Sequence, residues 1–412
     1  MNSDLQNGAL AGAVAACDAI GAAMLTRLTS RLGEDSGASG NVLACPVGLA
    51  LALATLRAGA ADNGTGIDAM LGVDTDAKTR DRVWSAVQRS LQRFDVADTQ
   101  QLQDFNPEAI PDTPLLHIAN NILAIGQTQP TQDYLGNAKR WYGAEVNRAE
   151  RPKAKAALDA WANLHTGGLI KESAINVTPL TRLVVQNALL FAARWAKHFN
   201  AAATAERQPF TRADGSTSRA DLMSRTGRLT FVTGPDWRAL RLRYVDGAGD
   251  SGSAGGSAAG SETLAMDVIL PRKVSSPIDL PPTTWGEATR RLTAAQTAGT
   301  TTNVHLRLPR LNLSSKPTDL TGVVKSLGVR LGFQDHIAPD LLVGQIVQQV
   351  KLVVAEAGTV AAALTEIKIR TGAPPRPEKL IDFTVDHPYV LRIVDLTSGI
   401  ALIEAAILDP AA

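Results

Sequence analysis

One segment near the end of the 412-residue chain constrains its fold more than any other. Residues 356–375 follow a buried-looking apolar run with only Gly358 as a turn, and they end in a proline-rich stretch. One alternate set of side chains is small and then apolar: Thr359, Ala361, Ala363, Thr365, Ile367 and Ile369. The other set includes the charged residues Glu366, Lys368 and Arg370. This period of two is typical of a half-buried strand, yet no partner of similar length precedes Pro374.

The small residues at the start of this segment suit a particular event. A strand that inserts between two packed strands must pass their side chains, and bulky groups would clash there. Thr359, Ala361 and Ala363 satisfy this requirement. The alternative is an alanine-rich helix that ends at Leu364, because alanine is the best helix former. The pattern alone leaves both interpretations open.

Composition excludes several classes of protein. The chain is 45% apolar and 20% charged, so it can bury a large core. Its 41 basic and 40 acidic side chains leave a net charge of +1, too little for non-specific binding of nucleic acid. The two cysteines, Cys17 and Cys45, rule out a disulfide framework or a cysteine-rich metal centre. Six scattered histidines argue against a metal cluster, and nothing suggests a cofactor.

The N-terminal region raises the question of membranes and export. No run of eighteen apolar residues occurs, so we expect no membrane span. Val14-Ala15-Ala16-Cys17 resembles a lipoprotein cleavage site, but the first eight residues contain Asp4 and no Lys or Arg. We therefore interpret this region as an amphipathic first helix, expect no export signal and leave the localisation unassigned.

Hydrophobic periodicity predicts an α+β protein. Helices are expected over 10–32, 46–59, 78–94, 131–142, 154–164, 284–296 and 318–327. Strands are expected over 116–125, 183–191, 239–244, 264–270, 304–308, 345–354, 389–394 and 400–408. Residues 246–261 consist almost wholly of Gly, Ala, Ser and Asp, which indicates a flexible hairpin loop between two strands.

Two local motifs suggest other functions. Arg82, Arg89 and Arg93 share one face of the helix expected at 78–94 and could contact a polyanion such as a sulfated sugar, although a solvated face is the alternative. Gly249-Asp250-Ser251-Gly252 spells the surroundings of a protease nucleophile. It lies inside the Gly/Ser/Ala tract, however, and no histidine precedes it in a suitable setting. We therefore do not expect an enzyme.

A series of short blocks carries a family resemblance. They are Asn41-Val42-Leu43 with Pro46-Val47, Tyr142-Gly143-Ala144-Glu145-Val146, Asn187-Ala188 with Phe191 and Trp195, Leu308-Pro309-Arg310, Glu356-Ala357-Gly358-Thr359 before an alanine run, and Phe383 with Asp386, Pro388 and Asp409-Pro410. Each block is weak alone. In this order, and spread over nearly the whole chain, they resemble the serpin family.

The resemblance implies both a fold and a mechanism. The fold would be a single domain over 1–412, with three β-sheets, eight or nine helices and an exposed reactive centre loop at about 356–380. The protein would be a metastable monomer that inhibits a serine protease, trypsin-like or elastase- or subtilisin-like, as a suicide substrate. The cleaved loop would insert into the main sheet and trap the acyl-enzyme. A non-inhibitory carrier or binding protein with the same fold is the alternative.

The resemblance also implies site residues. The hinge of the loop would comprise Glu356, Gly358, Thr359, Val360, Ala361, Ala362, Ala363, Leu364 and Thr365. Glu356 would pair with Arg310 near Trp195, in a region of the main sheet called the breach. The family's usual loop length places the scissile bond at Gly372-Ala373. A loop two residues shorter places it at Arg370-Thr371, where arginine suits a trypsin-like pocket.

The polar cluster beneath the opening sheet, called the shutter, departs from the family pattern. The matching positions hold Cys45, Gly48, Asn187 and Gln348, where the family normally has two serines, an asparagine and a histidine. Only the asparagine is retained. Gln348 can donate and accept hydrogen bonds but carries no titratable ring, so pH-sensitive sheet opening is not expected from this position.

Overall fold

The first helix explains why the N-terminal region is apolar. In the computed structural model, α1 runs over Ser3–Glu34 and buries Cys17, Ile20 and Met24 in the core. Its segment Leu10–Leu32 is long and apolar enough to cross a membrane by length and composition alone, but 44% of its most apolar window is buried inside the protein. The structure describes residues 3–34, 40–61, 65–73, 76–96, 98–106, 109–245, 263–343, 345–359 and 380–412.

Several expectations therefore lie outside the described residues. These are the loop 246–261 with its Gly-Asp-Ser-Gly motif, the hinge from Val360 to Thr365, and both candidate scissile bonds at 370–373.

The other helices of the described residues largely follow the predicted periodicity. They are α2 (Pro46–Leu56), α3 (Ile67–Met70), α4 (Ala77–Leu91), α5 (Gln100–Gln103), α6 (Gln132–Tyr142), α7 (Arg151–His165), α8 (Thr284–Thr297) and α9 (Thr321–Ser326), with short 3-10 turns η1 (Gln92–Phe94), η2 (Ala201–Ala203) and η3 (Pro277–Asp279). Local chemistry sets some boundaries. The Asp76 side chain accepts from the Thr79 amide at the start of α4, and Gly143 ends α6 with φ of 59°.

The strands form three sheets within the described ranges. The nine-stranded sheet contains β1 (Val42–Ala44), β17 (Ala401–Ile407), β16 (Tyr389–Asp395), β8 (Leu264–Pro271), β7 (Trp237–Arg243), β6 (Thr217–Thr233), β9 (Thr302–Pro309) and β15 (Ile381–Thr384) in that order, with β5 (Ala205–Thr211) paired to β6. The six-stranded sheet has the order β10 (Leu311–Ser314), β13 (Lys351–Val354), β14 (Gly358–Thr359), β4 (Leu183–Arg194), β2 (Leu115–Ile125) and β3 (Glu145–Ala149). The third sheet pairs β11 (Thr318–Asp319) with β12 (Val347–Gln348).

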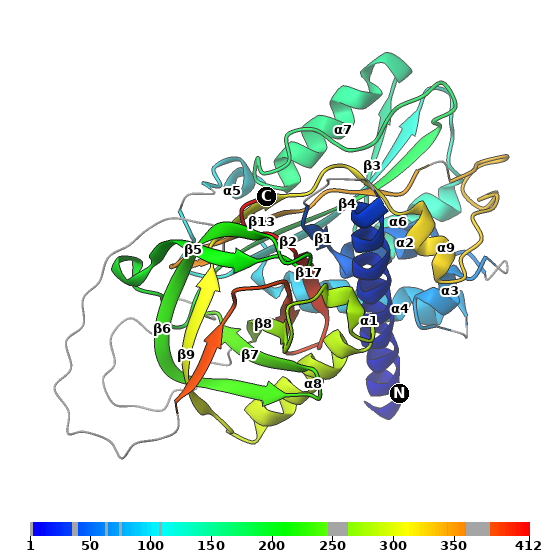
Figure 1. Cartoon of the computed structure of the whole chain (residues 1–412). Helices are drawn as coiled ribbons and strands as arrows, with labels where there is room; N and C mark the ends of the chain where they lie inside the picture. Colours follow the sequence, from blue (N-terminus) through cyan, green and yellow to red (C-terminus); the bar gives the residue numbers. More distant parts are fainter. Residues whose placement is uncertain are drawn as a thin grey trace.

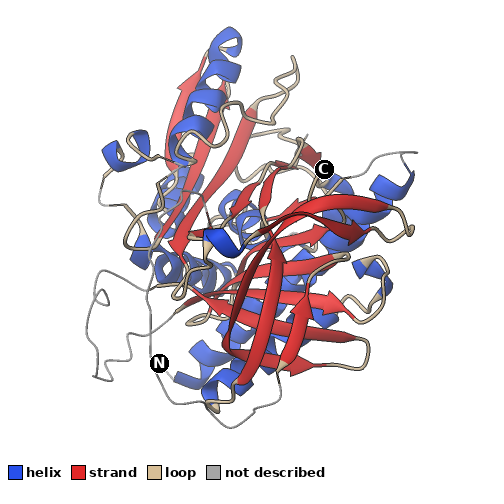
Figure 2. Ribbon diagram, turned by 60° about the vertical axis from the view of Figure 1, so that its left-hand side comes forward, coloured by secondary structure: helices blue, strands red, loops and turns tan. Residues whose placement is uncertain are grey.

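The six-stranded sheet is the main sheet, and helices flank its two faces. Figure 1 shows α7 lying beside β2, β3 and β4 on one face, and Figure 2, in which that side is turned forward, shows the helix in front of the strands. Even-numbered residues of β4, such as Val184, belong to the small core beneath α7. Odd-numbered residues, such as Val185, pack against the large core shared with the nine-stranded sheet.

Two sequence predictions need correction, and one long strand was missed. The strand expected over 345–354 is two short strands, because β12 pairs with β11 and only β13 joins the main sheet. The helix expected over 318–327 begins at Thr321, since Thr318–Asp319 forms β11. The seventeen-residue strand β6 was not predicted, because its alternation is obscured by exposed polar residues on a strand that serves two groups of partners.

Candidate functional site

The hinge of the predicted loop begins inside the main sheet. Gly358 pairs with Arg194 of β4, and Thr359 lies between Ala193 of β4 and Val354 of β13. A Cβ atom on Gly358 would lie 2.2 Å from the carbonyl oxygen of Ala193, so no other residue fits there without moving β4. Thr359 therefore belongs to a strand and not to the start of a helix.

The side chain of Thr359 is fixed by an aromatic cluster in the core. The Tyr244 hydroxyl lies 2.7 Å from the Thr359 hydroxyl, and both residues are buried. Tyr244 stacks on Trp195 with 4.6 Å between ring centroids, and Phe191 meets its edge. Burial raises the pKa of Tyr244, so the phenol stays protonated and available for this hydrogen bond. The cluster gives the hinge a defined docked position.

Trp195 also holds the backbone just before the hinge. Its indole nitrogen donates to the carbonyl of Ala355 over 2.9 Å, and its amide donates to Ala357 over 3.0 Å. The Phe199 amide donates to the carbonyl of Glu356. The turn that leads from β13 into β14 is therefore anchored on the β4 side of the sheet.

The acid at the hinge meets the basic residue that the resemblance indicated. Arg310 Nε lies 2.7 Å from Glu356 Oε1, and the Thr204 hydroxyl also donates to this carboxylate. Asp221 lies on the far side of Arg310, at 3.7 Å. Burial alone would raise the pKa of Glu356, but the hydrogen bonds from Arg310 and Thr204 outweigh it and lower the pKa. The carboxylate is thus charged at neutral pH.

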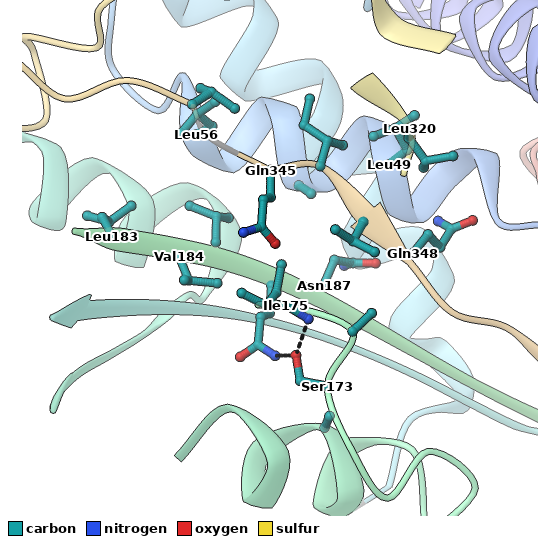
Figure 3. A pocket seen from close by; sticks show the side chains of 18 of the residues that line it. Leu49, Leu56, Ser173, Ile175, Leu183, Val184, Asn187, Leu320, Gln345 and Gln348 are labelled. Atoms are coloured by element: carbon teal, nitrogen blue, oxygen red, sulfur yellow. Dashed lines mark hydrogen bonds between the residues drawn. The ribbon is translucent and has the colours of Figure 1, made fainter. Parts of the chain in front are cut away.

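Below the hinge, the main sheet is open. β14 covers only the last two residues of β4, and a cavity of about 450 Å³ lies between the rest of that strand and the segment 341–349. Figure 3 shows this gap, with Leu183, Val184 and Asn187 on the side of β4 and Gln345 and Gln348 on the other. The backbone of β4 from Leu183 to Ala192 has β2 on one side and no strand of the described residues on the other. This edge can accept a strand.

Three of the four shutter residues, Gly48, Asn187 and Gln348, line this cavity, and Cys45 contacts it through Gln348. The polar side chains form two hydrogen-bonded groups. Gln348 accepts from the amide of Cys45 over 2.8 Å and donates to its carbonyl over 3.0 Å. Asn187 donates to the Asn120 side chain over 3.0 Å. Gly48 separates the groups, because a Cβ there would lie 2.7 Å from Asn187 and 2.8 Å from Cys45. Burial raises the pKa of the Cys45 thiol to about 12, which keeps it neutral and unreactive.

Sequence reasoning missed some members of the site. Tyr244 ends a predicted strand but carries no signal that links it to Thr359, which lies 115 residues away. Thr204 and Asn120 were equally unmarked. Asn120 is buried and extends the shutter network to Gln88, with an Asn120–Gln88 hydrogen bond of 2.9 Å. A buried amide in the strand predicted over 116–125 could have indicated Asn120, whereas Tyr244 and Thr204 carry no such signal.

The basic stripe on α4 is only partly present. Arg82 and Arg89 have exposed side chains, as predicted. Arg93 follows the end of the helix in η1, and its guanidinium donates to Asp395 and to Thr397. An arginine that neutralises a buried carboxylate contributes little to a polyanion site, so the three-residue stripe is reduced to two.

Comparison with known proteins identifies the family. The model for "Serpin (serine protease inhibitor)" matches residues 22–410. The chain is 28% identical to putative serpin-Z8 of Oryza sativa subsp. japonica, with 94% of each chain covered. It is 24% identical to plasminogen activator inhibitor 1 of Neovison vison, covering 83% of this chain and 84% of that one. The chain belongs to the serpin family, a family of non-enzymatic inhibitors.

Solved structures confirm the fold. The native stressed conformation of an Arabidopsis serpin superposes with a TM-score of 0.73 at 20% identity over 100% of both chains. Human thyroxine-binding globulin complexed with thyroxine superposes with a TM-score of 0.74 at 18% identity, covering 96% of this chain and 98% of that one. The predicted α+β serpin fold is therefore confirmed. The relatives of this chain thus include both a plasminogen activator inhibitor and a thyroxine-binding globulin.

Proposed function

We propose that this serpin is a suicide-substrate inhibitor of serine proteases, and that its residues from Gly358 onward become a full strand of the main sheet after cleavage. The observation that carries the proposal is the combination of a docked two-residue strand, β14, with an unfilled edge of β4 directly below it. β14 already sets the alignment with β4. Further residue pairs can therefore form along that edge without the entropic cost of bringing the two strands together.

The pairing of β14 defines the register of the inserted strand. Thr359 opposes Ala193, so antiparallel extension places Ala361 opposite Phe191, Thr365 opposite Asn187 and Ile369 opposite Leu183. Ile369 then meets the first residue of β4. The twelve residues 358–369 match the twelve residues of β4 one for one.

The side chains of the loop suit the two faces of the gap. Paired residues point to the same face, so the odd-numbered set from Thr359 to Ile369 would face the large core with Val185 and Leu189. That set is small and apolar. The even-numbered set, which holds Glu366, Lys368 and Arg370, would face the side of α7. Val360 and Leu364 share this outer set and should be tolerated there.

The register also bears on the scissile bond. The protease remains attached to the last residue before the cut, and a bulky protein cannot occupy the end of the sheet. A cut after Gly372 leaves Arg370 and Thr371 as a spacer between Ile369 and the ester-bearing residue, whereas a cut after Arg370 leaves no spacer. This favours Gly372-Ala373 on geometry, with Arg370-Thr371 as the alternative that suits a trypsin-like enzyme.

The chemistry follows the acyl-enzyme route. The protease serine attacks the carbonyl carbon of the scissile residue, the peptide bond breaks, and the new amine leaves with a proton from the protease histidine. An ester then joins the protease to the loop. Insertion pulls the ester and the protease along β4, and distortion of the oxyanion hole stops the hydrolysis that would release them.

Incubation with a trypsin-like protease and with an elastase- or subtilisin-like protease tests the proposal. We expect an adduct that survives denaturing electrophoresis, together with a released peptide beginning at Ala373 or at Thr371 in mass spectrometry. The strands β15, β16 and β17 lie beyond the cut, so the peptide should separate only after denaturation. Proteolysis without an adduct or any gain in thermal stability would contradict the proposal and favour a binding protein, as the likeness to thyroxine-binding globulin also allows.

A further inference from the structure

Two of the scattered histidines meet beneath α7, outside the hinge and the shutter. His117 lies on β2 and His165 is the last residue of α7, and both are buried. His117 Nε2 lies 2.9 Å from His165 Nδ1, a distance that requires a hydrogen bond between the two rings. The ring planes are 13° apart with 5.2 Å between centroids. This contact ties the end of the helix to the sheet.

A carboxylate stands at each end of the histidine pair. Asp95 Oδ1, just after η1, lies 2.6 Å from His117 Nδ1. Glu145 Oε1, at the start of β3, lies 3.2 Å from His165 Nε2. Trp161 of α7 donates to the other oxygen of Glu145 over 3.1 Å and packs on His165 with 4.5 Å between ring centroids. We call Asp95, His117, His165 and Glu145 the histidine chain.

All three contacts of the histidine chain can be hydrogen bonds in only one protonation state of the two rings. Its three contacts use all four ring nitrogens, and each contact needs one proton between its two heavy atoms. Three protons on four nitrogens make one imidazolium and one neutral imidazole. A fourth proton would place two N–H groups face to face across 2.9 Å. With only two protons, one of the three contacts has no donor.

Electrostatics around the histidine chain is consistent with one shared charge. The charged groups that face the rings are Asp95 from the segment after η1 and Glu145 from β3. The neighbouring Arg93 is directed to Asp395 instead, and Leu190 of β4 lies beside His117. The hydrogen bond from His165, together with its charge, lowers the pKa of Glu145 despite partial burial. Within the described ranges no group of three ligands suitable for a metal ion occurs.

The histidine chain is next to the gap in the main sheet. Trp161, Ala162 and Thr166 at the end of α7 line the cavity into which the loop is proposed to insert. A strand that fills this cavity would pack against that end of the helix. The position of His165 on β2 therefore bears on insertion.

We propose that the histidine chain is a pH-sensitive clamp: it fixes the end of α7 on β2 when the two rings share one extra proton, and it loosens when they gain a second proton or lose the shared one. Each of these changes adds or removes one proton on a ring nitrogen of the histidine chain. The consequence for loop insertion rests on the proposed function, whereas the clamp itself does not.

Hydrogen–deuterium exchange of the intact chain at pH 5, 7 and 9 tests the clamp. Protection of α7 is expressed relative to α8, which cancels the intrinsic effect of pH on exchange. We expect relative protection to be highest at the middle pH and about tenfold lower on either side, because a hydrogen bond to a charged group is lost. His165→Gln should remove the maximum in relative protection. Glu145→Gln should shift the loss of protection at high pH to a lower pH. His305→Gln, a partly exposed histidine on β9, should leave the profile unchanged.

Two outcomes would overturn the clamp. One is a wild-type profile that is flat in pH. The other is a His165→Gln protein that is less protected overall but keeps the wild-type maximum, as expected if the ring acts only by packing. Should His165→Gln fail to fold, the wild-type profile and His117→Gln still decide. If the clamp is confirmed but the cleaved chain gains no thermal stability, the proposed function fails and the clamp does not.

Discussion

At the scale of single residues, Thr359 is the hinge position that should tolerate substitution least. The residue is 2% exposed, and its hydroxyl is hydrogen-bonded to the buried phenol of Tyr244. We predict that Thr359→Arg blocks insertion, because burial of a guanidinium without a partner costs on the order of several kcal/mol. The loop would then be cut as an ordinary substrate, with the adduct lost from denaturing gels. Thr359→Ser keeps the hydroxyl for Tyr244 and should still form the adduct, and an unchanged adduct in Thr359→Arg would contradict the insertion mechanism.

The ion pair at Glu356 predicts a dependence on pH. Because the folded-state pKa of this carboxyl is lowered, its stabilisation is present above the ordinary glutamate range and is lost as the pH falls through the folded value. We expect Glu356→Gln to reduce the free energy of unfolding by about 1 kcal/mol at pH 6 and by almost nothing near pH 3. Urea unfolding at a series of pH values measures this difference. A difference that does not vary with pH would show that the ion pair is not its source.

At the scale of elements, the alternation of the loop predicts opposite results for two neighbouring residues. Ile367 would face the large core opposite Val185, whereas Lys368 would face the side of α7. Ile367→Glu should bury a charge on insertion and abolish most of the adduct. Lys368→Glu introduces the same residue one position away and should leave the adduct intact. Equal effects of the two substitutions, measured as the fraction of protease trapped, would show that the register is wrong.

The elements that could be predicted from sequence are those whose own residues are mostly apolar and therefore indicate burial. Mostly apolar runs identified β8, β16 and β17, each buried along its whole length. The segment 345–354 mixes apolar and polar residues and was predicted as one strand. Its division into β12 and β13 depends on the distant partners β11 and β10, so the division could not be predicted from the segment itself. The Glu356–Arg310 pair came from the family resemblance, and the Tyr244–Thr359 bond required the fold itself.

At the scale of the whole molecule, the open main sheet predicts that cleavage stabilises the protein. The cut loop could add about ten residues to β4 beyond the two already paired. With a net gain of roughly 1 kcal/mol per added residue pair, the midpoint of thermal unfolding should rise on the order of 10 °C or more. Differential scanning calorimetry before and after limited proteolysis measures the change.

A matched control for this rise is available in the same chain. A protease site engineered into residues 246–261 would nick the chain in a segment that the proposed mechanism does not insert into the main sheet. The nicked control should melt no higher than the intact protein. An equal rise for both cuts would mean that relief of a chain constraint, and not strand insertion, stabilises the cleaved form.

The gap beside β4 would also involve the solvent in the proposed insertion. A cavity of about 450 Å³ has room for about 15 water molecules at about 30 Å³ each, and the backbone amides along its edge are hydrogen-bonding groups that water can satisfy. Filling the gap with the loop returns that water to the bulk. Osmolytes such as sucrose, which are excluded from protein surfaces, therefore favour the filled sheet. Under the proposed mechanism, the lifetime of the open sheet would thus be set partly by the water activity around it.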